Sequence, residues 1–350
     1  MTGPETDSPV AIIGAGAWGT TLAWLLAGQG HPIRLWARNP ELAQRVQAER
    51  RNRKYLPTVT LPALVTASAD LPATLVDVDT VVVAVPSHGF RDVIVRAAPT
   101  LEAGCLIVSV VKGLERGTGM RMSEILAEEL TDPAAHPMAA LSGPNLSGEI
   151  VQGMPAVSVA AAVESAIAER VQALFSSRRF RVYRNCDIIG VELCGALKNV
   201  VAIGTGISDG LGFGDNAKAA LITRGLAEIG RVGVALGALP ATFWGIAGVG
   251  DLITTCNSRL SRNWQVGWRL ARGESLSGIQ ESTAAVAEGI YTTAAAREVA
   301  AKLAVPTPVT EAVYRILFGG ASPAAEVEQL MSRPQRAEAE PWQQAHRAEE

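Results

Sequence analysis

A glycine-rich turn near the start of the chain limits its possible folds more than any other feature. Gly14, Gly16 and Gly19 follow the β-branched run 10–13 directly and precede a helix-patterned segment at 20–28. Glycines at this spacing allow a tight turn, a close approach of phosphate to bare backbone, and close packing of a helix on a strand. The first amides of the helix would then face the anion. We therefore expect a strand–turn–helix unit that binds a dinucleotide, with a glycine turn that holds no ligand as the alternative.

Short runs rich in valine, isoleucine and alanine alternate with longer helix-patterned segments from Pro9 to about Gly143. This alternation is typical of parallel strands joined by crossover helices. We predict an α/β, Rossmann-like domain at residues 8–186 with a doubly wound, mostly parallel sheet. Its expected strands are 10–13, 33–36, 81–85, 106–111, 138–141, 156–160 and 180–183.

The pattern changes after Asn185 to long stretches rich in alanine, glycine and leucine, in which apolar residues recur at helical spacing. The three longest are 188–207, 216–236 and 284–303. We predict a second, all-helical C-terminal domain at residues 187–332, with the boundary near Asn185, Cys186 and Asp187. The charge-mixed residues 333–350 are typical of a loosely ordered polar tail.

The composition restricts the partners and the location of the chain. At 350 residues it is long enough for two domains, and 48% hydrophobic with 19% charged residues is normal for a globular protein. A formal net charge of −3 without a basic cluster argues against nucleic acid as a partner. The polar, acidic segment 1–9 does not have the pattern of a secretory signal, and no apolar run reaches the roughly 18 to 20 residues of a membrane span. We expect a cytoplasmic protein with no membrane span.

The four cysteines, Cys105, Cys186, Cys194 and Cys256, show no spacing typical of a metal site or of a redox motif. Each lies in or beside an apolar run, where cysteine acts as a small hydrophobic residue. We therefore expect reduced thiols in the core and no metal.

An arginine follows the second predicted strand, at a position that governs cofactor choice. A protein specific for NAD usually has an acidic residue there, which binds the ribose 2′-hydroxyl. In this chain the residue is Arg38. Because a guanidinium suits a 2′-phosphate, we expect NADP(H), with NAD(H) as the alternative cofactor. An arginine that is only solvated at the surface would fit the position as well.

Polar residues collect where the predicted strands end. Ser87 and His88 follow one apolar run, Lys112 follows the next, and Gly143 and Asn145 follow a third. Ligands of open parallel sheets bind outside the carboxyl ends of the strands. We therefore predict a binding cleft here, although alone Lys112 would fit a solvated loop and Asn145 a turn.

Lys198 lies inside an apolar helical pattern at residues 191–202. A lysine there must either extend its amine to water or perform a function. If it faces an enclosed cleft, desolvation lowers its pKa, and the amine becomes usable as a general acid or base.

Two further segments of the helical half carry polar groups at turns. Asp251 ends the glycine-rich turn 248–251, and Ser261, Arg262 and Asn263 open another helical run. Ser261 fits the N-cap of that helix. Alternatively all three residues bind an anion, because helix amides, a hydroxyl and a guanidinium favour phosphate.

Together these motifs resemble one family over about residues 10–330, the bacterial NAD(P)-dependent glycerol-3-phosphate dehydrogenases. Besides the glycine turn, the matching motifs are 55–57, 85–88, 112–115, 142–145, 180–183, 198–199, 208–210, 221–225, 250–252 and 261–263. The resemblance implies that the protein interconverts dihydroxyacetone phosphate and sn-glycerol 3-phosphate, with a hydride exchanged between nicotinamide and the substrate's second carbon. It also implies a homodimer and a role in supplying glycerol 3-phosphate for phospholipid synthesis.

The resemblance also assigns site residues. It makes Lys198 the catalytic lysine, which donates a proton to the forming alkoxide in reduction and accepts one in oxidation. The implied substrate-binding residues are Lys112, Gly143, Asn145, Lys198, Asp251, Ser261, Arg262 and Asn263. The implied cofactor-binding residues are Gly14, Gly16, Ala17, Trp18, Gly19, Arg38, Tyr55, Lys112, Ser147, Arg262, Val286 and Glu288.

The match departs from the family pattern at 146–149. Leu-Ser-Gly-Glu stands where relatives commonly have alanine and lysine before the glutamate, so this chain lacks one cation at the predicted cofactor site. Two rival interpretations remain. One is a dehydrogenase of the same architecture with a hydroxy-acid or ketopantoate-like substrate, which needs a carboxylate site. The other is a regulator that binds NADP(H) without turnover, in which Lys198 is structural.

Overall fold

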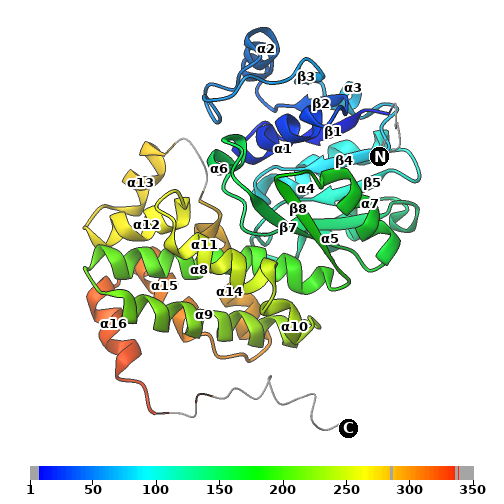
Figure 1. The fold of residues 1–350 in the computed structure, drawn as a ribbon. Coiled ribbons are helices and arrows are strands. Elements are labelled where there is room, and N and C mark those ends of the chain that lie inside the picture. Colours follow the sequence, from blue (N-terminus) through cyan, green and yellow to red (C-terminus); the bar gives the residue numbers. More distant parts are fainter. Residues whose placement is uncertain (1–7, 284–286, 336–337, 339–350) are drawn as a thin grey trace. The chain divides into compact units, whose positions relative to one another are not determined.

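The computed structural model describes residues 8–283, 287–335 and 338 (Figure 1). Within them the chain forms two compact units, which we call the sheet unit and the helical unit. The sheet unit contains residues 8–111 and 122–188. The helical unit contains residues 112–121 and those from 189 onward. The segment 112–121 therefore belongs to the helical unit although it lies inside the sequence range predicted for the α/β domain.

The sheet unit is built on one eight-stranded sheet in the order β3-β2-β1-β4-β5-β6-β7-β8. All neighbouring strands are parallel except β6 and β7, which are antiparallel. This confirms the predicted Rossmann-like fold. The strands are β1 (Val10–Ile13), β2 (Ile33–Trp36), β3 (Val65–Ser68), β4 (Thr80–Val83), β5 (Leu106–Ser109), β6 (Met138–Ser142), β7 (Ala156–Ala161) and β8 (Phe180–Asn185).

The carboxyl ends of four central strands lie in register at one edge of the sheet. Ile13 is opposite Trp36 on one side and Val83 on the other, and Val83 is opposite Ser109. Two strands are shorter than the apolar runs that predicted them, because pairing ends at Val83 and Ser109 while the apolar runs continue. The turns after β1, β2, β4 and β5 therefore start at the same level.

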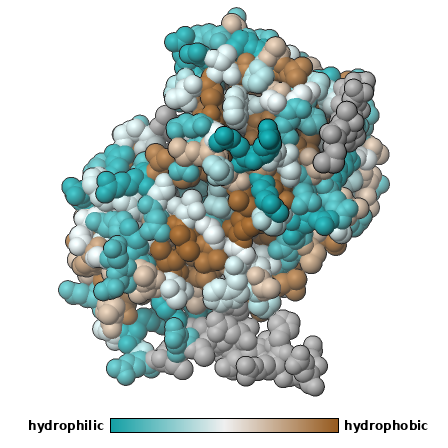
Figure 2. Space-filling view, viewed as in Figure 1, coloured by the Kyte–Doolittle hydropathy of each residue, from teal (hydrophilic) through white to brown (hydrophobic). Residues whose placement is uncertain are grey.

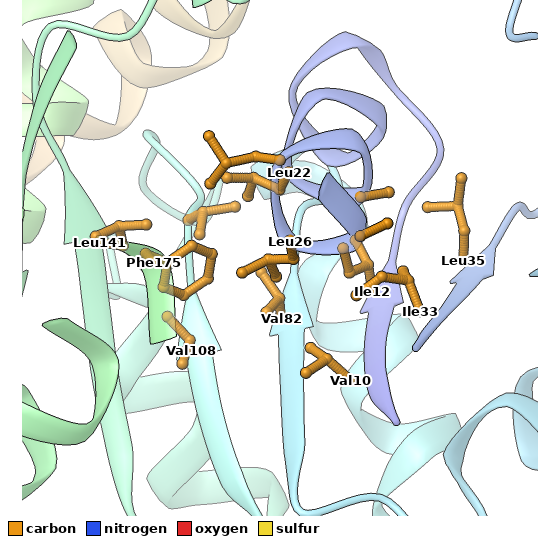
Figure 3. Packing of buried hydrophobic residues seen from close by; sticks show 14 of the residues in the cluster. Val10, Ile12, Leu22, Leu26, Ile33, Leu35, Val82, Val108, Leu141 and Phe175 are labelled. Carbon is orange, nitrogen blue, oxygen red and sulfur yellow. The ribbon is translucent and has the colours of Figure 1, made fainter. Parts of the chain in front are cut away.

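Helices cover both faces of the sheet. Leu22 and Leu26 of α1 pack on alternate residues of the sheet such as Ile12 and Val82 (Figure 3). Both leucines are buried, and each contributes about 1.5–3 kcal/mol by burial, so α1 is firmly held at the end of β1. The helices of this unit are α1 (Ala17–Gly28), α2 (Pro40–Glu49), α3 (Leu71–Leu75), α4 (Phe90–Ala97), α5 (Met122–Glu129), α6 (Ser147–Val151) and α7 (Ser165–Phe175). Helix α2 lies in a mostly hydrophilic part of the surface (Figure 2).

The helical unit is organised around one long helix, α8 (Ile188–Gly210), whose residues 190–208 are all buried. A Cβ on Gly206 would lie 2.0 Å from the carbonyl oxygen of Trp264, so α8 and α12 cross with their backbones in contact. The other helices are α9 (Asp215–Ala235), α10 (Pro240–Phe243), α11 (Asp251–Asn257), α12 (Arg262–Ala271), α13 (Leu276–Ser282), α14 (Glu288–Lys302), α15 (Pro308–Phe318) and α16 (Pro323–Met331). The described part of the chain after β8 is thus helical, as expected.

Helix α8 is long and apolar enough, by length and composition, to cross a membrane. Its most apolar 18-residue window has a mean hydropathy of 1.5, and 89% of that window is buried inside the protein. A search for an unbroken apolar run overlooks it, because Glu192, Lys198 and Asn199 interrupt the apolar residues. One such helix is weak evidence for a membrane span, since the core helix of a globular protein has the same length and composition.

The cysteine prediction is wrong for one residue. All four cysteines are free, and Cys105, Cys194 and Cys256 are buried as expected, but Cys186 is exposed. Cys186 lies between the end of β8 and the start of α8, outside both elements. Most of the predicted polar tail lies outside the described residues.

Candidate active site

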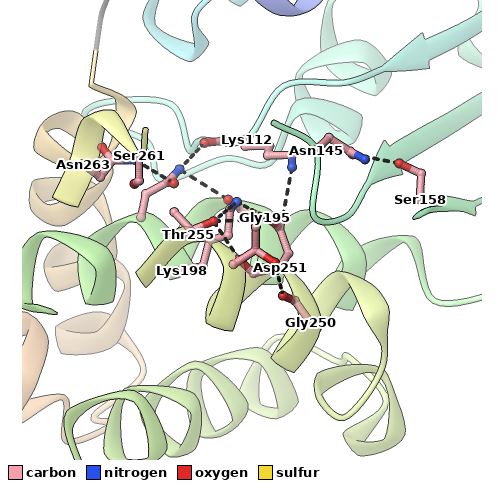
Figure 4. Close-up of polar contacts among 12 residues, drawn as sticks. Lys112, Asn145, Ser158, Gly195, Lys198, Gly250, Asp251, Thr255, Ser261 and Asn263 are labelled. Atoms are coloured by element: carbon pink, nitrogen blue, oxygen red, sulfur yellow. Dashed lines mark hydrogen bonds and ion pairs between the residues drawn. The ribbon is translucent and has the colours of Figure 1, made fainter. Parts of the chain in front are cut away.

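Two lysines converge on one buried aspartate in the helical unit (Figure 4). The Nζ atom of Lys198 lies 2.5 Å from Oδ1 of Asp251, and the Nζ atom of Lys112 lies 2.9 Å from Oδ2. Lys198 comes from the middle of α8, Asp251 from the start of α11, and Lys112 from the segment 112–121. Asp251 is 1% exposed. The prediction placed all three residues at one site, and the structure brings them together.

Lys198 does not extend to water, because only 6% of its side chain is exposed. The pKa of its amine is lowered to about 8, chiefly by burial; Asp251 opposes this shift, and the positive charge of Lys112 adds to it. Desolvation outweighs the carboxylate because the whole side chain is enclosed. An amine with a pKa near 8 can both donate and accept a proton close to neutral pH.

The position of Asp251 depends on the turn that precedes it. A π-helical turn, Ile246–Gly250, leads directly into α11, so the carboxylate lies at the helix start. One turn later, the hydroxyl of Thr255 donates to the backbone carbonyl of Asp251 at 2.7 Å and accepts from Lys198 at 2.6 Å. Lys198 therefore has two oxygen partners in fixed positions.

A chain of amides links the segment 112–121 to two helix starts. Asn199 donates from Nδ2 to the carbonyl of Lys112 at 2.9 Å and accepts at Oδ1 from Asn263 at 2.8 Å. Asn263 in turn accepts at Oδ1 from the amide of Gly289 at 2.9 Å. Asn199, Asn263 and Gly289 are all buried. The network therefore fixes Lys112 and the first turns of α12 and α14 relative to α8.

The start of α12 carries the predicted anion-binding residues. Ser261 is the N-cap, because its side chain accepts from the amide of Trp264 at 3.3 Å. Arg262 follows as the first helical residue and is exposed, whereas Asn263 is buried. Glu288 begins α14 and is partly buried, and Val286 lies outside the described residues.

The glycine turn of the sheet unit has the geometry that its spacing predicts. Gly14 has φ +119°, and a Cβ there would lie 2.7 Å from the carbonyl oxygen of Ala84. A Cβ on Gly19 would lie 1.9 Å from the carbonyl oxygen of Gly14, so the turn packs directly on α1. A Cβ on Gly16 would meet nothing within 4 Å. The backbone at Gly16 is therefore open to a ligand.

The other predicted cofactor residues of this unit lie around that turn or on nearby loops. Arg38 follows β2 and is exposed, without a hydrogen bond or ion pair to the described residues. The indole nitrogen of Trp18, the second residue of α1, is buried and has no partner among the residues that the structure describes. Tyr55 is partly buried, with the amine of Lys54 5.2 Å from its ring centre. Ser147 begins α6.

Gly143 and Asn145 follow β6, as expected. Gly143 has φ +148°, and a Cβ there would lie 2.8 Å from the carbonyl oxygen of Val157. Asn145 donates to the same oxygen at 3.1 Å and accepts from the hydroxyl of Ser158 at 2.8 Å. Asn145 thus ties the loop to β7, and one donor hydrogen remains on its amide.

Comparison with known proteins gives matches over almost the whole chain. Residues 9–168 match the family model described as NAD-dependent glycerol-3-phosphate dehydrogenase N-terminus, and residues 187–328 match the C-terminus model of the same name. The chain belongs to the NAD-dependent glycerol-3-phosphate dehydrogenase family. It is therefore an oxidoreductase with a nicotinamide cofactor, as predicted.

Relatives within the glycerol-3-phosphate dehydrogenase family are similar in sequence and in fold. A protein of Geobacillus thermodenitrificans named glycerol-3-phosphate dehydrogenase (NAD(P)+) is 48% identical over 330 residues, which cover 94% of this chain and 96% of the relative. The crystal structure of glycerol-3-phosphate dehydrogenase from Coxiella burnetii has a TM-score of 0.90 at 41% identity, covering 93% of this chain and 99% of that one. A ketopantoate reductase from Ralstonia eutropha has a TM-score of 0.57 at 18% identity over 92% of this chain and 99% of that one, so it shares the fold alone.

The sequence prediction missed two polar residues of the site. Thr255 contacts both Lys198 and Asp251, and Asn199 holds Lys112. Thr255 lies four residues after Asp251, so the helical period places it on the same face, and this spacing was the available signal. Asn199 follows Lys198 directly and was noticed only as part of a motif.

Proposed function

We propose that the protein interconverts dihydroxyacetone phosphate and sn-glycerol 3-phosphate, with Lys198 as the general acid and base. The buried cluster of Lys198, Asp251 and Lys112 carries this proposal. It provides one amine of lowered pKa, a carboxylate that holds it, and a second cation, all within hydrogen-bond distance. Family membership supports the substrate.

Lys198 moves the proton. In reduction its ammonium donates to the oxygen of the second carbon, and in oxidation the neutral amine takes the proton from the hydroxyl. Asp251 and Thr255 keep Nζ in one position, so the proton is delivered along a fixed direction. Lys112 adds a positive charge that stabilises the negative charge developing on the substrate oxygen.

The start of α12 is suited to the substrate phosphate. The first amides of a helix favour an anion, and Arg262 adds a guanidinium at the same end. Because the Ser261 oxygen already caps the helix, we assign it the donation of its hydroxyl hydrogen to the phosphate. Asn263 positions the helix start and adds its remaining amide hydrogen, and Gly143 and Asn145 complete the proposed substrate contacts.

The sheet unit fits a dinucleotide. Gly16 is open, and no described residue accepts a hydrogen bond from the amides of Gly16 or Ala17. When bound, the nicotinamide supplies or accepts the hydride at the substrate's second carbon. We assign the pyrophosphate to the turn Gly14–Gly19, the 2′-phosphate of NADP(H) to Arg38, and further contacts to Trp18, Tyr55, Ser147, Val286, Glu288, Lys112 and Arg262.

A direct assay tests this function. The purified protein should oxidise NADPH when dihydroxyacetone phosphate is added, with inorganic phosphate as a competitor of the substrate. Lys198→Ala should abolish turnover while NADPH binding remains measurable. Turnover of a hydroxy acid or ketopantoate-like compound instead, without competition by phosphate, would show that the substrate is wrong. NADPH binding without any turnover would favour a regulator.

We also propose a cytoplasmic homodimer that supplies glycerol 3-phosphate for phospholipid synthesis. The support is the family pattern, which extends over nearly the whole chain. Light scattering on the purified protein measures the oligomeric state. Loss of the protein from its cell should create a requirement for added glycerol 3-phosphate.

A further inference from the structure

Asn52 is a buried amide on the loop that follows α2, and it reaches back to the glycine turn. It is 1% exposed. Its Nδ2 atom donates to the carbonyl of Ala15 at 2.8 Å and to the hydroxyl of Thr20 at 2.9 Å. Both amide hydrogens are therefore used on the strand–turn–helix unit, more than 30 residues away in the chain.

Three consecutive carbonyls of this turn accept hydrogen bonds from the protein, one of them from Asn52. The carbonyl of Gly16 accepts from the amide of Thr20, and that of Ala17 accepts from the hydroxyl of Thr21. The carbonyl of Ala15 accepts from Asn52. Each of these carbonyls is thus held toward the protein, whereas the amides of Gly16 and Ala17 have no acceptor among the described residues. A peptide group whose carbonyl points inward presents its amide outward, as an anion site requires.

The two oxygen atoms of Asn52 accept hydrogen bonds from a second segment, the loop that carries Tyr55. Oδ1 accepts from the amide of Tyr55 at 3.3 Å, and the backbone carbonyl of Asn52 accepts from the amide of Leu56 at 2.8 Å. Asn52 and Leu56 also form an isolated antiparallel bridge. One residue therefore fixes both the glycine turn and the loop that carries Tyr55.

We propose that Asn52 is the positioning residue of the dinucleotide pocket. It acts through the Ala15 carbonyl and through the loop that carries Tyr55. In this way it sets the direction of the turn amides and does not itself contact the substrate. This rests on the proposed function in one respect, namely that NADP(H) binds at the turn Gly14–Gly19. A carboxylate at this position would keep the shape and the acceptor for Tyr55 but lose both donors.

The variants Asn52→Asp and Asn52→Ala, in the full chain, test the proposal through NADPH affinity. We expect the Kd for NADPH, measured by titration of intrinsic tryptophan fluorescence, to rise about tenfold in each, because an unpaired buried carbonyl turns and reorients the amides. At saturating NADPH, kcat and the KM for dihydroxyacetone phosphate should change less than about twofold. Thr20→Val, which leaves the bond to Ala15 in place, should raise the Kd by a smaller factor.

Gln172→Ala is the matched control. Gln172 also donates a side-chain amide to a backbone carbonyl, that of Val182, at 2.6 Å within the sheet unit. Its loss should lower the thermal midpoint with no change in NADPH affinity. If the Asn52 variants likewise lower the midpoint and keep the wild-type Kd for NADPH, Asn52 is only structural and the proposal is wrong. If the wild-type protein itself fails to bind NADPH, the proposed function fails, and this outcome is distinguished before any variant is measured.

Discussion

The two units of the chain use different means to present polar groups. Among the described residues, the sheet unit buries a single charged side chain, Asp187, whereas the helical unit buries Glu192, Lys198, Glu228, Asp251 and Glu326. The predicted pocket of the sheet unit consists mainly of glycines and backbone amides. Backbone amides bind without titrating, whereas burial lowers the pKa of Lys198 and raises that of Glu228 in the helical unit. We therefore expect the dinucleotide pyrophosphate to bind to the sheet unit and the proton chemistry to take place in the helical unit.

The largest expected effect comes from Asp251→Asn in the helical unit. The substitution leaves two lysines facing an uncharged amide, so Lys198 loses the partner that holds its proton and its position. We expect kcat to fall about thousandfold, within the range of general acid–base catalysis, while the Kd for NADPH changes little. The measurements are steady-state turnover and a fluorescence titration. Equal losses in kcat and in NADPH affinity would contradict the separation of cofactor binding and proton chemistry between the two units.

Proton transfer by Lys198 gives the second effect, a pH dependence. Reduction needs the protonated amine, and its pKa in the folded protein is lowered by burial to about 8. The kcat for reduction should therefore be constant below about pH 8 and fall about tenfold for each pH unit above it, while oxidation should rise up to the same point. Because Asp251 raises this pKa, the residual activity of Asp251→Asn should show the break at lower pH. Profiles that coincide for the two proteins would exclude Lys198 as the titrating group.

How much of this the sequence predicts differs between the units. The glycine turn and most strands follow from local sequence spacing. The conformation of the turn depends on the glycines within it and not on distant residues. The prediction missed strand β3, because Val65 is the only large apolar residue in Val65–Ser68 and the strand is at the sheet edge.

The helical site was predicted in its residues but not in its connections. Lys112 and Asp251 lie 139 positions apart, so no local pattern reveals their contact. For the same reason the sequence gives no sign that 112–121 joins the helical unit, where Arg121 pairs with Glu192 at 2.8 Å. Asn52 was overlooked because an isolated asparagine in a loop most often forms a turn.

In the sheet unit, Arg38→Asp tests cofactor choice with an intermediate effect. If Arg38 binds the 2′-phosphate, its replacement removes a charge-assisted bond and adds repulsion. We expect the KM for NADPH to rise about tenfold to hundredfold and that for NADH to change much less. Arg45, an exposed arginine on α2, provides the control, since Arg45→Asp changes the net charge equally. A similar loss for both cofactors would mean that Arg38 is only a surface residue.

The last expected effect concerns stability and not activity, and it comes from a buried charge of the helical unit that takes no part in the proposed chemistry. Glu228 accepts from the amides of Val309 and Thr310 at the start of α15, at 2.6 and 3.1 Å. Burial raises the pKa of its carboxyl to about 7, although these hydrogen bonds lower it. A raised carboxyl pKa means that the folded state holds a proton that the unfolded state releases between about pH 4.5 and 7. Stability from this group is therefore full below that range, declines through it, and is constant above it.

Glu228→Gln removes this titration, and urea unfolding of both proteins at about pH 5 and pH 8 measures the result. The glutamine keeps one acceptor but turns its amide toward a backbone donor, so the variant should be less stable at the lower pH. Its deficit relative to the wild type should shrink by about 3 kcal/mol at the higher pH, because the wild type alone then carries a buried charge. Glu164→Gln, at an exposed position of the sheet unit, should differ from the wild type by the same small amount at both pH values. A constant deficit for Glu228→Gln would mean that the amides of α15 keep the carboxylate ionised throughout, and that burial in the helical unit does not by itself shift a titration.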